Sequence, residues 1–193
     1  MHEVIASIHE NKIGDFQIPS FKMVRGCMVR LWVQKPTICR ESILVDELIK
    51  LLLIDLKENY SLPIYEYKLK PHKKFRFSLK SYRVCDFILE HNLKSEPALF
   101  EKFDLNSNYK IKQLGNHQIK ILELLKMFSQ HKVCIFDFYG VGPLGENLLT
   151  NFINSMLLKG KTILAFDDYN FKSNSDIDND RLININIKRN CKQ

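Results

Sequence analysis

The chain has 193 residues, a hydrophobic content of 45% and a formal net charge of +7, so it has enough apolar material for one moderate domain or two small ones. No apolar run approaches the roughly 18 residues that cross a bilayer, and the N-terminal residues have no apolar signal core, so the sequence predicts neither a membrane span nor secretion. Five scattered cysteines form no C-x-x-C pair, which argues against a paired-thiol zinc site and is typical of a reducing cytoplasm. We therefore expect a cytoplasmic protein with no metal site.

The first third of the chain alternates strand-like and helical stretches. Residues 4–8 and 28–33 are short runs with the apolar pattern of strands. Residues 41–60 place leucines at helical spacing, and residues 62–69 read as a further strand before a proline. Residues 78–93 form a second predicted helix with one apolar face.

A basic segment lies between residues 65 and 83. Seven lysines and arginines stand there against Glu66 alone, a balance of +6, and aromatic residues are interleaved with them. Such a field attracts acidic peptides or nucleic acid, although a charged run is also typical of a solvated face. With its strands and helices, the stretch 1–95 resembles a winged helix in a generic way, and such modules bind nucleic acid or peptides. The candidate peptide-binding residues are Lys68, Lys70, Lys73, Lys74 and Arg76.

The second half contains a strand, a glycine turn, a helix and a second strand. A predicted helix over 113–131 leads into residues 133–136, a continuous apolar run typical of a buried parallel strand. Gly140, Gly142 and Gly145 then form a complete G-x-G-x-x-G sequence. A helix is predicted over 146–159, and a strand over 162–166.

This order of elements suits a nucleotide. The first glycine permits a sharp turn, the second lets the backbone approach a phosphate, and the third permits close packing. The phosphate would lie at the helix N-terminus, where free N–H groups favour negative charge. Asp167 and Asp168 directly follow the second strand, where an acidic side chain can bind ribose hydroxyls. A glycine turn that binds nothing is the alternative.

Two families use this unit, the NAD-dependent dehydrogenases and the ThiF-type adenylating enzymes related to ubiquitin-activating enzymes. The sequences GVGPLGENLL (140–149) and DDYNFKSN (167–174), with the helix that precedes them, resemble the second family over about residues 108–175. The resemblance implies ATP as the ligand and adenylation of a carboxylate as the reaction. The nucleotide-binding residues that it implies are Gly140, Gly142, Gly145, Asp167, Asp168 and Asn174.

The sequence departs from that family at several positions. Pro143 stands in place of a glycine and removes one N–H from the phosphate loop. The family's arginine does not follow Asn174, and its later lysine, aspartate and zinc cysteines have no counterpart here. These departures predict a degenerate member that binds ATP weakly, and they leave its catalytic residues unknown.

An ABC ATPase is a lesser alternative. In that interpretation LGNHQ (114–118) is a decayed signature sequence and VCIFD (133–137) is the Walker B strand. No glycine lies between Gly26 and Gly115, so the glycine-rich phosphate loop has no place where it is required. Phe138 would stand in the position of the catalytic glutamate.

From these observations we expect an α/β fold with two modules, a winged-helix-like module over 1–95 and a shortened Rossmann-like module over 105–193. In the ThiF-type family such a pairing implies a protein of ribosomal peptide or bacteriocin biosynthesis. It would present a leader peptide to a partner modifying enzyme, or else adenylate a peptide or sulfur-carrier C-terminus itself. The expected partners are an acidic precursor peptide and that enzyme, with nucleic acid and an oligomer left open and no membrane partner.

Overall fold

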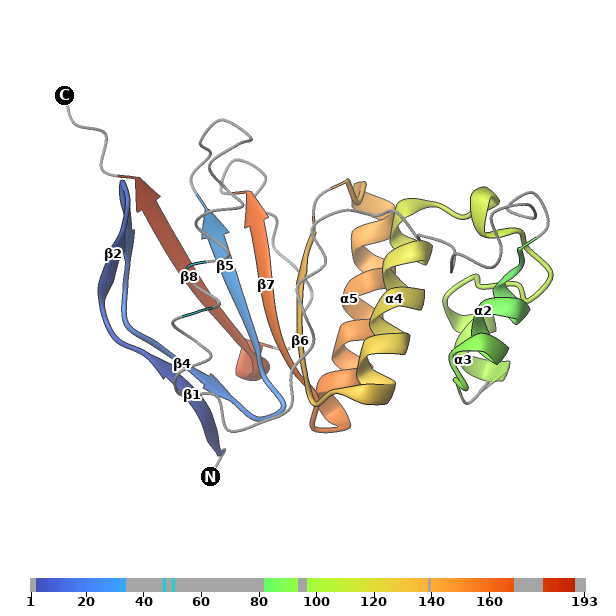
Figure 1. Ribbon diagram of the computed structural model, residues 1–193, viewed down its shortest axis with the longest axis horizontal. Coiled ribbons are helices and arrows are strands. Elements are labelled where there is room, and N and C mark those ends of the chain that lie inside the picture. The colour runs from blue at the N-terminus through green and yellow to red at the C-terminus, as the bar shows by residue number, and fades with distance from the viewer. Residues whose placement is uncertain are drawn as a thin grey trace.

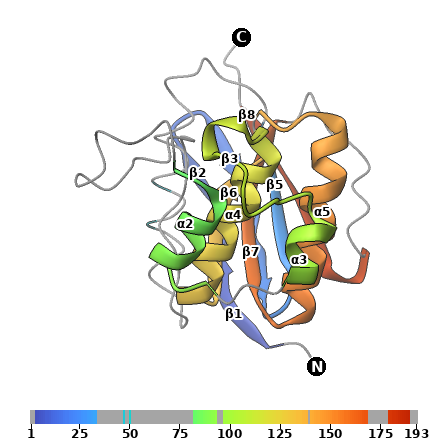
Figure 2. The ribbon, with the colours of Figure 1, turned by 90° about the vertical axis from the view of Figure 1, so that its right-hand side faces the viewer.

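A computed structural model describes residues 3–33, 47, 50, 82–93, 97–138, 140–168 and 179–189. Figure 1 shows the described elements in layers, with a curled sheet, then a pair of long helices, then two short helices. Figure 2 looks onto the short helices, and the long pair lies between them and the sheet.

The main sheet has six strands in the order β2-β3-β8-β5-β7-β6. The strands β8, β5, β7 and β6 run parallel, while β3 pairs antiparallel with β8 and with β2. Two further strands, β1 and β4, form an antiparallel pair of their own. The bounds are β1 Val4–Ile8, β2 Asn11–Ile13, β3 Phe16–Ile18, β4 Phe21–Val24, β5 Met28–Val33, β6 Val133–Asp137, β7 Thr162–Asp168 and β8 Leu182–Arg189.

The helices follow the apolar periodicity of the second half. The long pair is α4 (Asn116–Gln130) and α5 (Pro143–Leu158), and the short pair is α2 (Val84–Glu90) and α3 (Pro97–Lys102). Single 3-10 turns lie at Ile111–Gln113 and Asn179–Arg181. Proline is well placed at the first position of α5, since the N–H that it lacks has no partner within a helix there.

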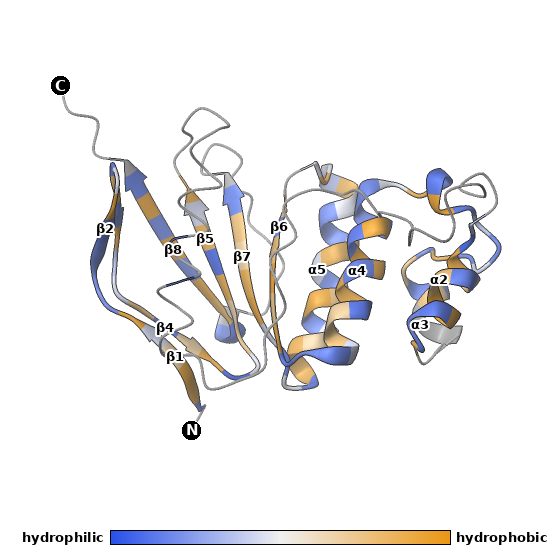
Figure 3. Cartoon of the chain, viewed as in Figure 1, coloured by the Kyte–Doolittle hydropathy of each residue, from blue (hydrophilic) through white to orange (hydrophobic). Residues whose placement is uncertain are grey.

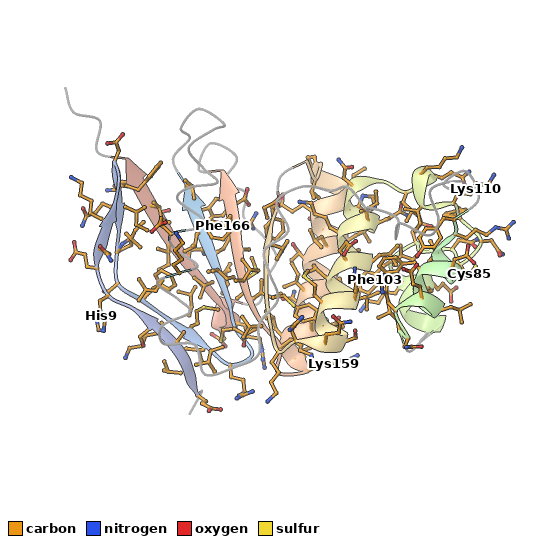
Figure 4. The ribbon with its side chains drawn as sticks, viewed as in Figure 1. His9, Cys85, Phe103, Lys110, Lys159 and Phe166 are labelled. Atoms are coloured by element: carbon orange, nitrogen blue, oxygen red, sulfur yellow. The ribbon has the colours of Figure 1, made fainter. Side chains whose placement is uncertain are left out.

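Two apolar cores lie on opposite faces of the sheet. Residues of β5 and β6 are buried at every position, as expected for strands that are covered on both sides. One core joins the sheet to the helices, and Phe103 and Phe152 meet edge to face within it at 5.3 Å between ring centroids. Figure 4 labels Phe103 beside the long helices. The other core joins the sheet to β1 and β4. Figure 3 shows the apolar character of β6 and of most of β7.

A lysine from another element closes the end of α4. The ammonium group of Lys161, which precedes β7, donates to the carbonyl oxygens of Phe128 at 2.5 Å and His131 at 2.9 Å. The last carbonyls of a helix have no partner within the helix, and a cation suits that end of the dipole. This contact therefore fixes α4 to the start of β7.

The structure confirms a mixed α/β fold with a largely parallel sheet, and it confirms strands over 4–8, 28–33 and 133–136. The helix predicted over 146–159 is present but begins earlier, at Pro143. The pairing of β5 with β7 and β8 carries the sheet across the boundary predicted between residues 95 and 105. The winged-helix-like module is not confirmed, because the elements predicted over 41–60 and 62–69 lie almost wholly outside the described residues.

Candidate functional site

Arg30 lies buried in the middle of β5, with 1% of its surface exposed. Its guanidinium donates through Nε and Nη2 to one carboxylate oxygen of Asp167, in β7, with Nε at 2.9 Å. The same Nη2 donates to Glu146 Oε1 at 2.9 Å, in the first turn of α5. One buried cation therefore joins two strands and a helix.

Two aromatic rings enclose the guanidinium. Its carbon lies 4.3 Å from the centre of the Trp32 ring and 4.1 Å from the centre of the Phe138 ring. Cation–π contacts of this kind strengthen when water is excluded. Trp32 is held in turn by a 2.8 Å hydrogen bond from its indole N–H to Asn184 of β8. These contacts fix the arginine through Nε, Nη2 and the two ring faces, while its Nη1 is buried without a hydrogen-bond partner among the described residues.

A second buried pair lies beside the first. Lys120 of α4 is fully buried, and its ammonium group donates to Asp137 Oδ1 at 2.8 Å and to the carbonyl oxygen of Asp137 at 2.6 Å. Burial lowers the pKa of Lys120, while the charges of Asp137 and Asp167 act in the opposite direction. Asp137 is the last residue of β6, so this pair fixes the end of the edge strand to α4.

Together these five side chains form what we call the charged core, which consists of Arg30, Lys120, Asp137, Glu146 and Asp167. Two cations face three carboxylates, a formal balance of −1. Isolated buried charges are costly, so each of these groups depends on its partners. The charged core lies toward the carboxyl ends of β6 and β7 and the start of α5, the edge where open α/β sheets bind their ligands.

The three predicted glycines lie beside the charged core and have different roles. Gly140 has a φ of +74°, which suits glycine, and its carbonyl accepts a 2.9 Å hydrogen bond from Asn116. Gly142 is the N-cap residue of α5, and a Cβ placed there would meet nothing within 4 Å. Gly145 lies inside α5, where a Cβ would come within 2.8 Å of His117 in α4. The third glycine thus permits close contact between two helices.

The predicted acidic and basic residues fall in different places. Asp167 is paired with Arg30, and Asp168 ends β7. Asn174 and the basic residues Lys68, Lys70, Lys73, Lys74 and Arg76 lie outside the described residues. Their roles stay predictions.

Sequence reasoning missed Arg30, Lys120 and Glu146. A signal for Arg30 was present, because it is the one charged residue in the apolar run 28–33, whereas Lys120 lies in a helix that carries other charged residues. A cation at such a position is either a solvated residue or one half of a buried pair. Its partner is far away in the chain, so the sequence pattern alone does not choose between them.

The described part of the chain contains no group of three or more histidine, cysteine or acidic residues that could hold a metal ion. It also contains no helix that is both long enough and apolar enough to cross a membrane.

Solved structures with a similar fold include ATP-binding cassettes of ABC transporters. A nucleotide-free cassette from an ABC transporter matches with a TM-score of 0.57 at 15% identity, covering 97% of this chain and 90% of the other. A transporter cassette in its ADP conformation matches with a TM-score of 0.54 at 15% identity, covering 87% and 82%. The RNase-L Inhibitor matches with a TM-score of 0.59 at 12% identity, covering 86% of this chain and 34% of the other.

The chain has the fold of an ATP-binding cassette. At this level of identity the likeness concerns the fold alone. No protein-family model matches the sequence, and no curated protein is similar to it.

The ThiF-type resemblance is therefore wrong. This chain does contain the predicted strand, glycine turn, helix and strand, but that local order is shared by several α/β folds and does not identify a family. The functions drawn from the resemblance, which were leader-peptide presentation, adenylyl transfer and bacteriocin biosynthesis, lose their support. The prediction of a peptide and a modifying enzyme as partners is unsupported as well, and so is the prediction that no membrane partner exists. The lesser alternative, an ABC ATPase domain, has the fold that the comparisons find.

Proposed function

We propose that this chain is a cassette-fold domain that does not hydrolyse ATP and that serves as the inactive partner in an ABC-type assembly. The observation that carries the proposal is the pair between Lys120 and Asp137. In P-loop enzymes the Walker B aspartate holds Mg²⁺. Asp137 ends the strand that reads as Walker B, and its carboxylate is engaged by a buried ammonium group instead.

The phosphate loop supports the same conclusion. A P-loop uses glycines so that successive backbone N–H groups can cradle the phosphates, and a lysine to reach them. A P-loop lies between a strand and a helix, and in this parallel sheet β5 is the candidate for that strand. The sequence contains no glycine from Cys27 to Leu114, so the loop after β5 lacks the residue type that this chemistry needs.

The residue after Asp137 is also unsuited to hydrolysis. Phe138 is buried and packs against the guanidinium of Arg30. A general base must accept a proton from the attacking water, and a phenyl ring has no atom that can do so. Loss of the base, the phosphate loop and the free Walker B carboxylate together predicts no measurable turnover.

Any nucleotide that binds is expected to bind weakly. Gly142 retains open space at the N-terminus of α5, which favours negative charge. Pro143 contributes no N–H there, and Glu146 already places a negative charge in the first turn. We therefore propose this turn as the remaining point of contact for ATP.

For a partner we propose a membrane-spanning transporter subunit. Several of the solved cassettes with this fold come from ABC transporters, although the RNase-L Inhibitor shows that the fold is not confined to them. A cassette without hydrolytic residues fits a role as the structural half of an assembly whose other cassette supplies turnover. Co-purification with a detergent-solubilised multispanning protein, identified by mass spectrometry, supports this partner. Recovery of the whole chain free of membranes contradicts it.

Phosphate release from ATP and Mg²⁺ by the purified full chain tests the catalytic part of the proposal. We expect a rate equal to the blank. Asp137→Asn is the diagnostic variant, and Asp180→Asn, at an exposed position, is its matched control. Release that disappears in Asp137→Asn and persists in Asp180→Asn would be true activity and would overturn the proposal. Release that persists equally in both variants comes from a contaminant.

A further inference from the structure

In P-loop enzymes the Walker B aspartate holds Mg²⁺, and the corresponding residue in this chain is Asp137. Mg²⁺ requires octahedral oxygen ligands at about 2.0–2.1 Å, commonly one or two carboxylates together with waters and phosphates. Among the side chains that the structure describes, the carboxylates near the ends of β6 and β7 that form ion pairs are those of Asp137, Asp167 and Glu146.

Each of these carboxylates is already engaged by a buried cation. Asp137 Oδ1 lies 2.8 Å from the ammonium nitrogen of Lys120, a distance that a hydrogen bond fills and a metal ion cannot share. Asp167 and Glu146 both accept from the guanidinium of Arg30. A divalent cation would therefore have to displace an ammonium or a guanidinium group from inside the protein.

The surroundings of the charged core also oppose a metal ion. The rings of Trp32 and Phe138 lie on the guanidinium of Arg30, and ring faces are not ligands for a hard cation. Placing a divalent ion beside two cations would add strong repulsion, because most of these side chains are buried. The residues present do not fit Mg²⁺.

We infer that the side chains of Lys120 and Arg30 occupy the place of the divalent cation and neutralise the carboxylates that would otherwise bind it. Any nucleotide that this cassette-fold domain binds is therefore bound without a metal ion. The inference rests on the proposed function and concerns the same site. The charged core should then have the same structure with and without nucleotide. Its side chains, rather than a bound metal nucleotide, hold together β5, β6, β7, α4 and α5.

Thermal unfolding and nucleotide titration of the full chain test the inference. For the wild type we expect the same unfolding midpoint in excess Mg²⁺ and in EDTA, with and without ATP. A fluorescent ATP analogue should show a dissociation constant that changes by less than about twofold between the two conditions. A midpoint that rises with Mg²⁺ in the wild type, with the rise abolished in Asp137→Asn, would overturn the inference.

A gain of metal response provides the positive result. Lys120→Met leaves the carboxylate of Asp137 without its cation, so Mg²⁺ or Mn²⁺ should raise the unfolding midpoint of this variant relative to EDTA. The double variant Lys120→Met/Asp137→Asn should lose that response. If Lys120→Met does not fold, the wild-type measurement still decides. Failure of the proposed function would appear separately, as phosphate release that Asp137→Asn abolishes.

Discussion

The ammonium group of Lys120, in α4, donates hydrogen bonds to both the carboxylate and the backbone carbonyl of Asp137, the last residue of the edge strand β6. Both residues are buried. Removing one partner of such a pair leaves an uncompensated buried charge, whereas removing both charges costs much less. We therefore expect Lys120→Met to destabilise the fold by about 3–5 kcal/mol. Lys120→Met/Asp137→Asn should recover most of that loss. Urea unfolding measures both, and equal losses in the single and double variants would show that the charge pairing is not what matters.

The contact between Gly145 and His117 predicts a steric effect. A methyl group at Gly145 would lie 2.8 Å from the Cβ atom of His117, so one helix must move. Gly145→Ala should destabilise the protein by about 1–3 kcal/mol, as overpacking does. Gly142→Ser is the matched control, because a side chain there meets nothing and serine is a good N-cap residue. Adding His117→Ala to Gly145→Ala should restore stability; without such a rescue, the helix contact is not the cause.

Glu123 on α4 gives a prediction for pH. Burial raises the pKa of its carboxyl above the ordinary 4.5, and Lys126 opposes this only in part. A raised pKa means that the folded state binds the proton of Glu123 more tightly than the unfolded state does. The contribution of this carboxyl to the free energy of unfolding is therefore most favourable below pH 4.5, and it declines as pH rises through the folded pKa. Glu123→Gln cannot lose that proton. It should be more stable than the wild type at neutral pH and should lose this advantage below pH 4.5, as read from urea midpoints across the range. A constant difference at all pH values would contradict this.

The Lys161 ammonium group predicts a local effect at the end of α4. Its two hydrogen bonds to the carbonyls of Phe128 and His131 disappear in Lys161→Met, which keeps the apolar stem. We expect a loss of about 1.5–3 kcal/mol, the range for hydrogen bonds that involve a charged group. Hydrogen exchange should quicken in the last turn of α4 before it changes elsewhere. Lys112→Met, at an exposed position, is the control and should behave like the wild type.

The sequence predicts the β6–α5–β7 unit well, because these elements are contiguous and each carries its own apolar period. It does not predict the sheet order, since β5 pairs with β7 and β8, which lie more than 100 residues further along the chain. The choice of family failed for the same reason. A glycine turn between a strand and a helix occurs in several α/β folds, and only the long-range strand pairing separates them.

The charged core shows the same limit at the level of one residue. Arg30 is a charged residue in a run with the apolar pattern of a strand, and it is buried because Asp167 and Glu146 supply its partners. Those partners are 137 and 116 positions away. The absence of glycine between Gly26 and Gly115 is visible in the sequence itself, and there it counted against the cassette interpretation whose fold the chain has.

The state of the Lys120 ammonium group tests the central claim most directly. A buried, hydrogen-bonded ammonium exchanges its protons slowly, so its nitrogen–proton resonance should be visible by NMR and absent in Lys120→Arg. We predict that this resonance keeps its position when ATP and excess Mg²⁺ are added, because Asp137 stays bound to Lys120 and no metal enters. Loss or displacement of the resonance on adding Mg²⁺ with ATP, but not ATP with EDTA, would show that a metal ion takes Asp137 and would contradict the account.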